Sequence, residues 1–307
     1  MEKIIIFGGS GFIGKHLVDQ LATNYEVIVI SRYPKSFNHS NNKNVKVERL
    51  RRRDTSKLSK LFEGSKAVIN LAGESVSGKW TEKKMEKIRK SRLDVDSIIV
   101  RTIISTQNKP EVVIQGSAIG VYGYTRDTID ITEETIFGKR GFLPKVAISH
   151  EESFKQLEST CRVVYARTGL VLDRKEGALP KMARQFKLFI GGKIASGKQW
   201  NSWIHIDDEV RAIEFLLENN SCVGAFNLTA PNPVQNKDFS SSLAKALKRP
   251  SFIPAPSFMI QLLFGKMGKE LLNSGLKVLP AKLLKAGFSF NHVDIDEAFN
   301  DIYHKEK

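Results

Sequence analysis

The chain has 307 residues, 41% of them hydrophobic and 26% charged, which is typical of a soluble enzyme and long enough for two lobes. Its apolar runs are too short for transmembrane helices and it opens directly on an apolar segment, so we expect no membrane partner, no secretory signal and a cytoplasmic location. The 48 Lys and Arg residues against 33 Asp and Glu give a charge of +15, but the dense runs at 49–53 and 79–92 do not interleave aromatic residues as a nucleic-acid stacking platform would. We therefore expect no nucleic-acid partner and infer a basic surface that attracts small anions.

Two cysteines, Cys161 and Cys222, lie in apolar, strand-like surroundings. Small core residues are the simplest interpretation of both. No Cys/His cluster has the spacing of metal ligands, so we predict no metal site.

The first 30 residues carry the strongest local pattern. An apolar strand at 3–7 runs into Gly8, Gly11 and Gly14, and an amphipathic helix and a second apolar strand at 27–30 follow. Gly8 is expected to turn the chain off the strand, Gly11 to let the backbone approach a pyrophosphate, and Gly14 to let the helix pack on the sheet. The pattern predicts a βαβ unit whose helix N-terminus binds the phosphates of a dinucleotide.

The end of the second strand distinguishes the two nicotinamide dinucleotides. An acidic residue there accepts a hydrogen bond from a free ribose hydroxyl and selects NAD. This chain has Ser31 and Arg32 instead, a donor and a cation suited to a 2′-phosphate. The sequence therefore predicts NADP as the cofactor.

Strands and helices alternate through the next 140 residues, which predicts an α/β fold with a doubly wound parallel sheet. The strand at 67–71 ends in Ala72 and Gly73, where a cofactor could pass close to the backbone. The predicted order is a loop at 34–44, a strand at 45–47, a helix at 54–62 capped by Asp54, the strand at 67–71, a helix capped by Thr81 and running to 105, a strand at 111–115, a helix from about 143 to 159, and a strand at 162–167.

The pattern changes beyond residue 170, and we divide the chain into three parts. Residues 1–170 are the predicted NADP-binding domain, residues 171–250 complete the sheet and form a smaller substrate lobe, and residues 251–307 are a helical tail. Expected elements are helices at 177–197, 209–218 (capped by Asp207 or Asp208), 236–247, 259–272, 280–286 and 294–303, a strand at 226–228, and a linker at 250–256.

Several motifs in order resemble those of an atypical extended short-chain dehydrogenase/reductase. They are Gly8-Gly-Ser-Gly-Phe-Ile-Gly14, Asn70-Leu-Ala-Gly-Glu74, Ser91-Arg92, Val121-Tyr-Gly123, Arg167-Thr-Gly169 and Trp203-Ile-His-Ile-Asp-Asp208. Phe252-Ile-Pro-Ala-Pro256, Leu279-Pro280 and Gly287-Phe288 narrow the resemblance to epimerase-family proteins with a distinctive C-terminal domain.

This resemblance implies a Rossmann domain with strand order 3-2-1-4-5-6 that binds NADP, beside a smaller substrate lobe. Carried over position by position, it implies that the cofactor contacts Gly8, Ser10, Gly11, Phe12, Ile13, Gly14, Ser31, Arg32, Leu71, Ala72, Gly73 and Arg92. Arg51 stands where related enzymes often have an aspartate that contacts adenine.

The expected catalytic residues depart from the family pattern. Ala118 stands where the family usually has Ser or Thr, with Ser117 beside it. Leu143 and Ala147 stand where the family usually has Tyr and Lys. The remaining candidates are Ser117, Tyr122, and Glu74, which would act as a base if desolvation raised its pKa. Glu74 could equally pair with Lys79 or Arg92, Tyr122 could simply pack, and His205 is more readily a core histidine than a proton shuttle.

The resemblance favours an NADP-dependent oxidoreductase or epimerase acting on an unidentified small anionic or activated carbonyl substrate. The alternative is a non-catalytic NADP(H) sensor that acts through a protein partner, which the missing triad favours. A homodimer is compatible with the sequence, which does not determine the oligomeric state.

Overall fold

The computed structural model describes residues 1–34, 42–50, 55–124, 129–136, 138, 141–251 and 275–304. The predicted cap Asp54, the adenine-loop residue Arg51, the predicted helix at 259–272 and most of the loop at 34–44 and of the linker at 250–256 lie outside the described residues.

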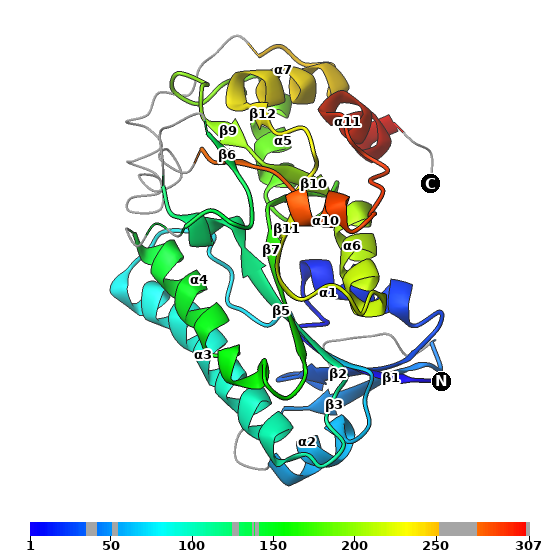
Figure 1. The fold of residues 1–307 in the computed structure, drawn as a ribbon. Coiled ribbons are helices and arrows are strands. Elements are labelled where there is room, and N and C mark those ends of the chain that lie inside the picture. The colour runs from blue at the N-terminus through cyan, green and yellow to red at the C-terminus, as the bar shows by residue number, and fades with distance from the viewer. Residues whose placement is uncertain are drawn as a thin grey trace.

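A parallel sheet of seven strands forms the centre of the molecule (Figure 1). In space the order is β3-β2-β1-β4-β5-β7-β11, which confirms the expected doubly wound arrangement, and the strand predicted at 226–228 lies at the β7 edge as β11. These strands are β1 (Lys3–Phe7), β2 (Glu26–Ser31), β3 (Val45–Arg49), β4 (Ala67–Asn70), β5 (Val112–Ala118), β7 (Arg162–Thr168) and β11 (Gly224–Leu228).

Helices cover both faces of the sheet, because its strands are apolar on both sides. Ile4 and Ile6 pack in one core with α1 (Phe12–Leu21) and α6 (Ile206–Glu218). Ile5 and Phe7 point the opposite way, into a second core with α2 (Thr55–Phe62) and α3 (Glu82–Ser105). The alternation follows from the two-residue period of a strand.

A smaller lobe packs around Trp203, Phe239 and Phe299, which are all fully buried. Its helices α5, α7 and α11 gather at the top of Figure 1. The remaining elements are η2 (Ile119–Tyr122), β6 (Asp130–Ile131), α4 (Phe142–Glu152), η3 (Lys155–Leu157), β8 (Leu170–Leu172), α5 (Leu179–Lys187), β9 (Trp200–Asn201), β10 (Trp203–His205), β12 (Val234–Gln235), α7 (Asn236–Ala246), β13 (Lys277–Val278), α10 (Ala281–Lys285) and α11 (Ile295–His304).

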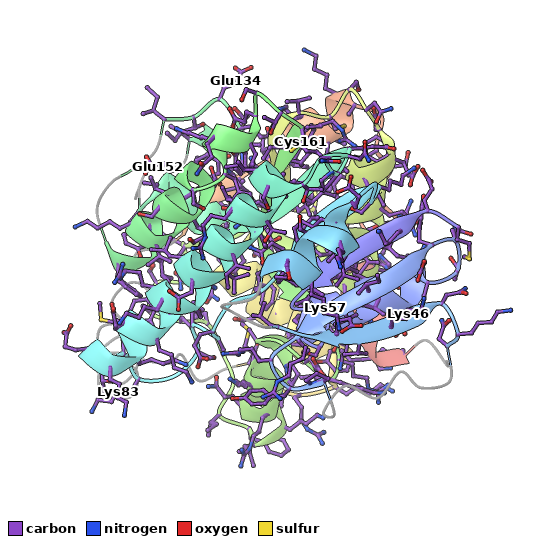
Figure 2. The ribbon with its side chains drawn as sticks, turned by 90° about the horizontal axis from the view of Figure 1, so that it is seen from below. Lys46, Lys57, Lys83, Glu134, Glu152 and Cys161 are labelled. Atoms are coloured by element: carbon purple, nitrogen blue, oxygen red, sulfur yellow. The ribbon has the colours of Figure 1, made fainter. Side chains whose placement is uncertain are left out.

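The cap predicted for α3 is confirmed. Thr81 accepts a hydrogen bond from the amide of Lys84 at 3.2 Å. Ile88, Val95, Ile99 and Ile103 of that helix are buried. Lys46 and Lys57 lie near the β3 edge of the sheet (Figure 2). Lys46 forms an exposed ion pair with Glu26 of β2, and Lys57 forms one with Glu48 of β3.

Two predicted helix lengths are wrong. The helix expected at 177–197 ends at Lys187, because Phe189 adopts a left-handed backbone (φ 61°) and the chain folds back so that Gly191 lies against Phe186. The helix expected to reach 159 ends at Glu152. There Ser153 donates its hydroxyl to the carbonyl of His150, a local bond that competes with the helix.

The cap predicted for α6 is also wrong. The helix begins at Ile206, and His205 is the N-cap, its Nδ1 accepting from the amide of Asp207 at 3.2 Å. Asp208 is instead fully buried and accepts from the backbone amides of Asn291 and His292. It thereby ties α6 to the segment before α11.

Cys161 and Cys222 are free thiols, and Cys222 is buried in the core beneath α6. Within the described part of the chain, no helix is both long and apolar enough to cross a bilayer.

Candidate functional site

The glycines after β1 are held by close backbone approaches. Gly8 has a φ of 80°, and a Cβ there would lie 2.6 Å from the backbone of Leu71. A Cβ at Gly14 would lie 2.2 Å from the carbonyl oxygen of Gly8. A side chain at either position would collide with main chain, so the turn from β1 into α1 requires glycine at both.

The N-terminus of α1 opens beside this turn. The helix begins after Gly11, which provides no side-chain cap, and no acidic residue occupies the first turn. The first amide groups of a helix have no partners within it, so this end presents donors and a positive dipole end to any bound anion. Ser10 and Gly11 are exposed and Phe12 and Ile13 are half-buried, as a surface cradle requires.

The end of β2 lies next to this cradle, because Phe7 and Ile30 are paired in the sheet. Ser31 is buried, and its hydroxyl oxygen accepts from the amide of Tyr33 at 3.1 Å. Arg32 is exposed, with its guanidinium carbon 5.9 Å from the centre of the Tyr33 ring.

The end of β4 forms the third side of the cradle. The amide of Leu71 donates to the carbonyl of Phe7 at 2.8 Å, and that of Ala72 donates to the side chain of Asn70 at 3.1 Å. Arg92 lies across Gly73, where a Cβ would come within 2.9 Å of its guanidinium carbon. The structure therefore brings together the predicted residues at positions 8–14, 31–32, 71–73 and 92, from four separate segments.

Glu74 does not have the environment that a catalytic base would need. It pairs with Lys84 at 2.8 Å and Lys87 at 3.2 Å, not with Lys79, and Arg92 donates to its backbone carbonyl rather than its carboxylate. The hydrogen bond from Lys84 lowers the pKa of Glu74, although partial burial opposes this. The condition set for a catalytic Glu74, a raised pKa, is not met.

Ser117 and Tyr122 belong to one network of buried side chains. Arg167 of β7 forms a two-point ion pair with Glu151 of α4, at 2.9 and 2.8 Å. Ser117 donates to the same carboxylate at 2.7 Å, and Arg167 donates to the hydroxyl of Tyr122 at 2.9 Å. The Tyr122 hydroxyl in turn donates to Asn227 of β11 at 2.7 Å.

The network fixes these groups at the ends of β5 and β7. Tyr122 is only 5% exposed, and burial raises its pKa although Arg167 opposes this. Ser117 is half-buried. Of the three predicted catalytic side chains, Ser117 and Tyr122 are therefore linked through Arg167 and Glu151, and Glu74 stands apart on the β4 side.

The positions of the expected tyrosine and lysine lie on α4 in apolar surroundings. Leu143 packs on a cluster of Trp80, Ile88 and Val146, and Ala147 packs on the cluster that contains Tyr122. The ring of Tyr124 lies against Gly141, directly before this helix, where a Cβ would be 2.3 Å from Cε2.

A second buried network, which was not predicted, joins the ends of β4 and β5 to α3 and α4. Asp96 of α3 contacts Nδ1 of His150 at 2.6 Å and accepts from Asn70 at 3.1 Å. Gln115 of β5 bonds to both Asn70 and His150. Since Asn70 also holds the amide of Ala72, the network shapes the β4 side of the cradle. An aspartate inside the apolar stripe of α3 was the sequence signal.

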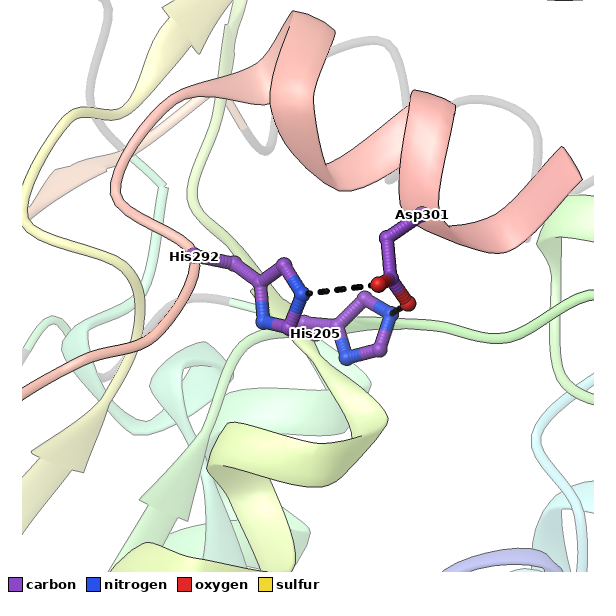
Figure 3. Close-up of side chains that lie close together, drawn as sticks. All are labelled: His205, His292 and Asp301. Atoms are coloured by element: carbon purple, nitrogen blue, oxygen red, sulfur yellow. Dashed lines mark ion pairs between the residues drawn. The ribbon is translucent and has the colours of Figure 1, made fainter. Parts of the chain in front are cut away.

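His205 is buried as predicted, but it does not lie among apolar side chains alone. Its ring stacks on that of His292, with centres 3.8 Å apart, and both face Asp301 of α11 (Figure 3). Burial lowers the pKa of His205, whereas the hydrogen bond to Asp208 raises the pKa of His292. His205 is far from His292 and Asp301 in the sequence, so the spacing rule that predicted no metal site could not detect the cluster.

Comparisons with known proteins cover the whole chain. Residues 4–228 match the NAD dependent epimerase/dehydratase family, and residues 255–302 match a domain of unknown function, DUF1731. Epimerase family protein YfhF of Bacillus subtilis is 34% identical over 98% of this chain and 97% of its own length. The Arabidopsis thaliana epimerase family protein SDR39U1 homolog, chloroplastic, is 34% identical over 97% of this chain and 86% of its own length.

A solved structure agrees with these matches. The crystal structure of human epimerase family protein SDR39U1 (isoform2) with NADPH is 28% identical, with a TM-score of 0.87 over 99% of this chain and 100% of that one.

Proposed function

Because the chain belongs to the NAD dependent epimerase/dehydratase family, we propose that it binds NADP(H) in the cradle between the β1 to α1 turn and the ends of β2 and β4. The observation that carries the proposal is the uncapped start of α1 beside Gly8 and Gly14, whose backbones leave no room for a side chain. The similar human protein whose structure was solved with NADPH supports it.

The preference for NADP(H) over NAD(H) rests on the end of β2. Arg32 is exposed there and can pair with a 2′-phosphate, and the buried hydroxyl of Ser31 lies directly before it. A charge-assisted hydrogen bond contributes about 1.5 to 3 kcal/mol, so at least about tenfold discrimination is expected.

Each part of the cradle has a separate task in this proposal. The amides at the start of α1, near Ser10 to Ile13, hold the pyrophosphate. The backbone from Leu71 to Gly73 lets the dinucleotide pass along the ends of the strands. Arg92 lies against Gly73 and donates to the carbonyl of Glu74 directly after it.

We further propose an oxidoreductase or epimerase-like activity on a small anionic or activated carbonyl substrate. A bound nicotinamide would supply hydride transfer. Ser117 is half-buried and donates its hydroxyl proton to Glu151, so its oxygen can accept a hydrogen bond from a substrate hydroxyl, while Tyr122 is held by Arg167 and Asn227. A substrate already activated toward hydride needs less help from an acid, which suits a site with Leu143 and Ala147 on α4.

An alternative function is supported by the same contacts. The hydroxyl of Tyr122 is engaged on both sides, and the carboxylate of Glu74 is paired with two lysines and has a lowered pKa. A protein whose candidate acids and bases are occupied in this way suits an NADP(H) sensor, in which bound nucleotide changes the affinity for a protein partner.

Calorimetric titration with NADPH and NADH tests the cofactor. NADPH should bind at least about tenfold more tightly, and Arg32→Asp should narrow or reverse the preference. Arg101→Asp makes the same change of charge on the exposed face of α3 and should leave the preference unchanged. Equal affinities for the two dinucleotides would contradict the proposal.

A panel of nucleotide sugars and activated carbonyl compounds, incubated with NADP(H), tests catalysis. Oxidation of NADPH by a carbonyl compound, weakened by Ser117→Ala, would support the enzyme. Nucleotide-dependent capture of a partner without turnover would support the sensor. Fast interconversion of an ordinary nucleotide sugar, unaffected by Tyr122→Phe and Glu74→Gln, would contradict the proposed absence of the usual proton-transfer residues.

A further inference from the structure

His205, His292 and Asp301 form a cluster at the junction of the sheet domain and the smaller lobe (Figure 3). His205 stands where β10 enters α6, His292 precedes α11, and Asp301 lies on α11. Nε2 of His205 is 3.5 Å from Oδ2 of Asp301, and Nε2 of His292 is 3.7 Å from Oδ1 of the same carboxylate. One ligand atom from each residue lies within 4.8 Å of the others.

A second observation points to a missing ligand. The side chain of His205 is 97% buried, and its Nε2 lies 3.5 Å from Oδ2 of Asp301 but makes no hydrogen bond with any residue that the structure describes. A buried polar atom without a hydrogen bond is costly and calls for an explanation. This nitrogen is directed toward Asp301 (Figure 3). Asp301 and His292 also line a pocket that is open to solvent.

We propose that these three side chains bind a divalent transition metal such as Zn²⁺, a site independent of the proposed NADP(H) cradle. Two imidazoles and a carboxylate are a donor set that Zn²⁺ accepts. Tetrahedral bonds of about 2.0 to 2.2 Å place ligand atoms about 3.3 to 3.6 Å apart. The ligand atoms here lie within 4.8 Å of one another, and the two histidines face different oxygens of Asp301, so the side chains must draw together around an ion. His292 and Asp301 line a pocket from which water can reach the fourth position.

The surroundings of His292 suit ligation through Nε2, whereas His205 must first move a proton. Asp208 accepts from Nδ1 of His292 at 3.3 Å, and a carboxylate at this position fixes a metal-binding imidazole. In His205, Nδ1 accepts from the amide of Asp207, which leaves the proton on Nε2. Metal binding transfers that proton to Nδ1, which then gives up its hydrogen bond from the amide of Asp207 and faces the carboxylate of Asp207 at 3.8 Å instead.

Binding also requires a small movement of the rings. The two imidazoles are stacked with an angle of 24° between their planes, so they must splay for their in-plane lone pairs to converge on one ion. A bound ion would then join α6 to α11 and stabilise the packing of the C-terminal helix, because a ligand that binds only the folded state raises its stability.

Metal binding is measured on the full chain, freed of purification tags and treated with a chelator. Calorimetry with Zn²⁺ should give one ion per chain, and Zn²⁺ should raise the melting temperature. The Co²⁺ form should show a tetrahedral spectrum without thiolate charge transfer, which excludes Cys161 and Cys222 as ligands.

Two variants test the ligands separately. His292→Phe keeps an aromatic ring for stacking, and Asp301→Asn keeps the shape of the carboxylate. Each should weaken Zn²⁺ binding by at least about tenfold and reduce the rise in melting temperature at the same Zn²⁺ concentration, even if the variant itself is less stable. Glu297→Gln, which changes another residue lining the same pocket, should bind Zn²⁺ normally. Absence of binding, or binding weakened equally by Glu297→Gln, would overturn the proposal and leave a metal-free His–His–Asp cluster.

Discussion

The cradle around α1 and the network around Arg167 lie along the same carboxyl edge of the sheet but are built differently. The cradle consists of backbone: glycines at 8 and 14, uncapped amides and an exposed Arg32. The network consists of charged and polar side chains that are almost fully buried, centred on Arg167 and Glu151. The shape of the cradle depends on glycines, which have no side chain, whereas the shape of the network depends on pairs of side chains.

The difference predicts how each region fails. A backbone cradle is damaged by added atoms, and the damage should appear mainly as lost ligand affinity. A buried ion pair is damaged when one partner is removed, because the other charge stays in a medium that solvates it poorly. Substitutions in the two regions should therefore separate stability from binding.

The largest expected effect is on the stability of Arg167→Met. Removal of the guanidinium leaves Glu151 buried, with the hydroxyl of Ser117 as its one remaining side-chain donor among the described residues, and the cost should be about 3 to 5 kcal/mol. Urea denaturation measures it. Arg167→Met combined with Glu151→Gln should be more stable than Arg167→Met alone, because no unpaired charge remains.

The exposed pair of Lys46 and Glu26 provides the control for that loss. Lys46→Gln should cost no more than about 1 kcal/mol, because both side chains are solvated. A similar small loss in Arg167→Met would show that the buried network contributes no more than a surface pair.

A smaller effect on stability, with a large effect on binding, is expected for Gly14→Ala. The new Cβ would lie 2.2 Å from the carbonyl oxygen of Gly8, and the helix must shift, at a cost of about 1 to 3 kcal/mol. The shift moves the amides that are proposed to hold phosphate, so NADPH affinity should fall in calorimetric titration. Gly120→Ala, where a Cβ meets nothing within 4 Å, should change stability by no more than about 1 kcal/mol.

The cradle could be predicted from sequence and the network could not, for the same physical reason. Gly8, Gly11 and Gly14 follow one strand at fixed spacing, so local pattern determines their roles. Arg167 and Glu151 come from β7 and α4, and Asp96 meets His150 across 54 residues. The pairing of β6 with β13 spans an even longer stretch of chain.

The sequence does indicate that such contacts exist, because it contains charged residues within apolar segments. A charged residue within an apolar stripe, such as Asp96 in α3 or Arg167 at the end of β7, must find a partner when it is buried. The sequence indicates that a partner exists without identifying it. The cap of α6 was predicted wrongly for the same reason. Asp208 was a candidate cap, but it accepts hydrogen bonds from backbone amides of the distant segment before α11.

A third prediction concerns Glu209, which belongs with the buried network. It is fully buried, accepts from Thr168 at 2.7 Å, and burial raises its pKa from 4.5 to about 8. As the pH rises from 4.5 to 8, the unfolded chain ionises this carboxyl while the native state keeps it neutral. Glu209 therefore lowers stability progressively across that range, by at most about 1.4 kcal/mol per pH unit.

Glu209→Gln removes this pH dependence. The amide nitrogen introduced in place of Oε2, which has no hydrogen-bond partner, should cost about 1 to 3 kcal/mol at every pH. The variant should thus be less stable than the parent at pH 5 and should equal or exceed it at pH 8. Parallel stability profiles in urea at these two pH values would contradict the raised pKa.

The smallest effect is expected for Glu74→Gln, on the cradle side of the comparison. The carboxylate pairs with Lys84 and Lys87 close to solvent, so its loss at pH 7 should cost about 1 kcal/mol or less. Because the pKa of Glu74 is lowered in the native state, this contribution is present above the unfolded value near 4.5 and is lost as the pH falls below it. The two proteins should therefore become equally stable in acid.

The same variant tests whether the cradle side also carries catalysis. An ionised carboxylate held by two ammonium groups is a poor acid and a weak base at neutral pH, so any turnover of NADPH should be nearly unchanged in Glu74→Gln. Glu86→Gln, which removes a neighbouring exposed carboxylate paired with Arg89 and Lys90, controls for the change in surface charge on α3. A rate loss of about 100-fold or more, confined to Glu74→Gln, would assign the proton transfer to Glu74. It would also show that substrate binding raises the pKa of Glu74. The cradle would then contribute a catalytic side chain as well as binding the cofactor.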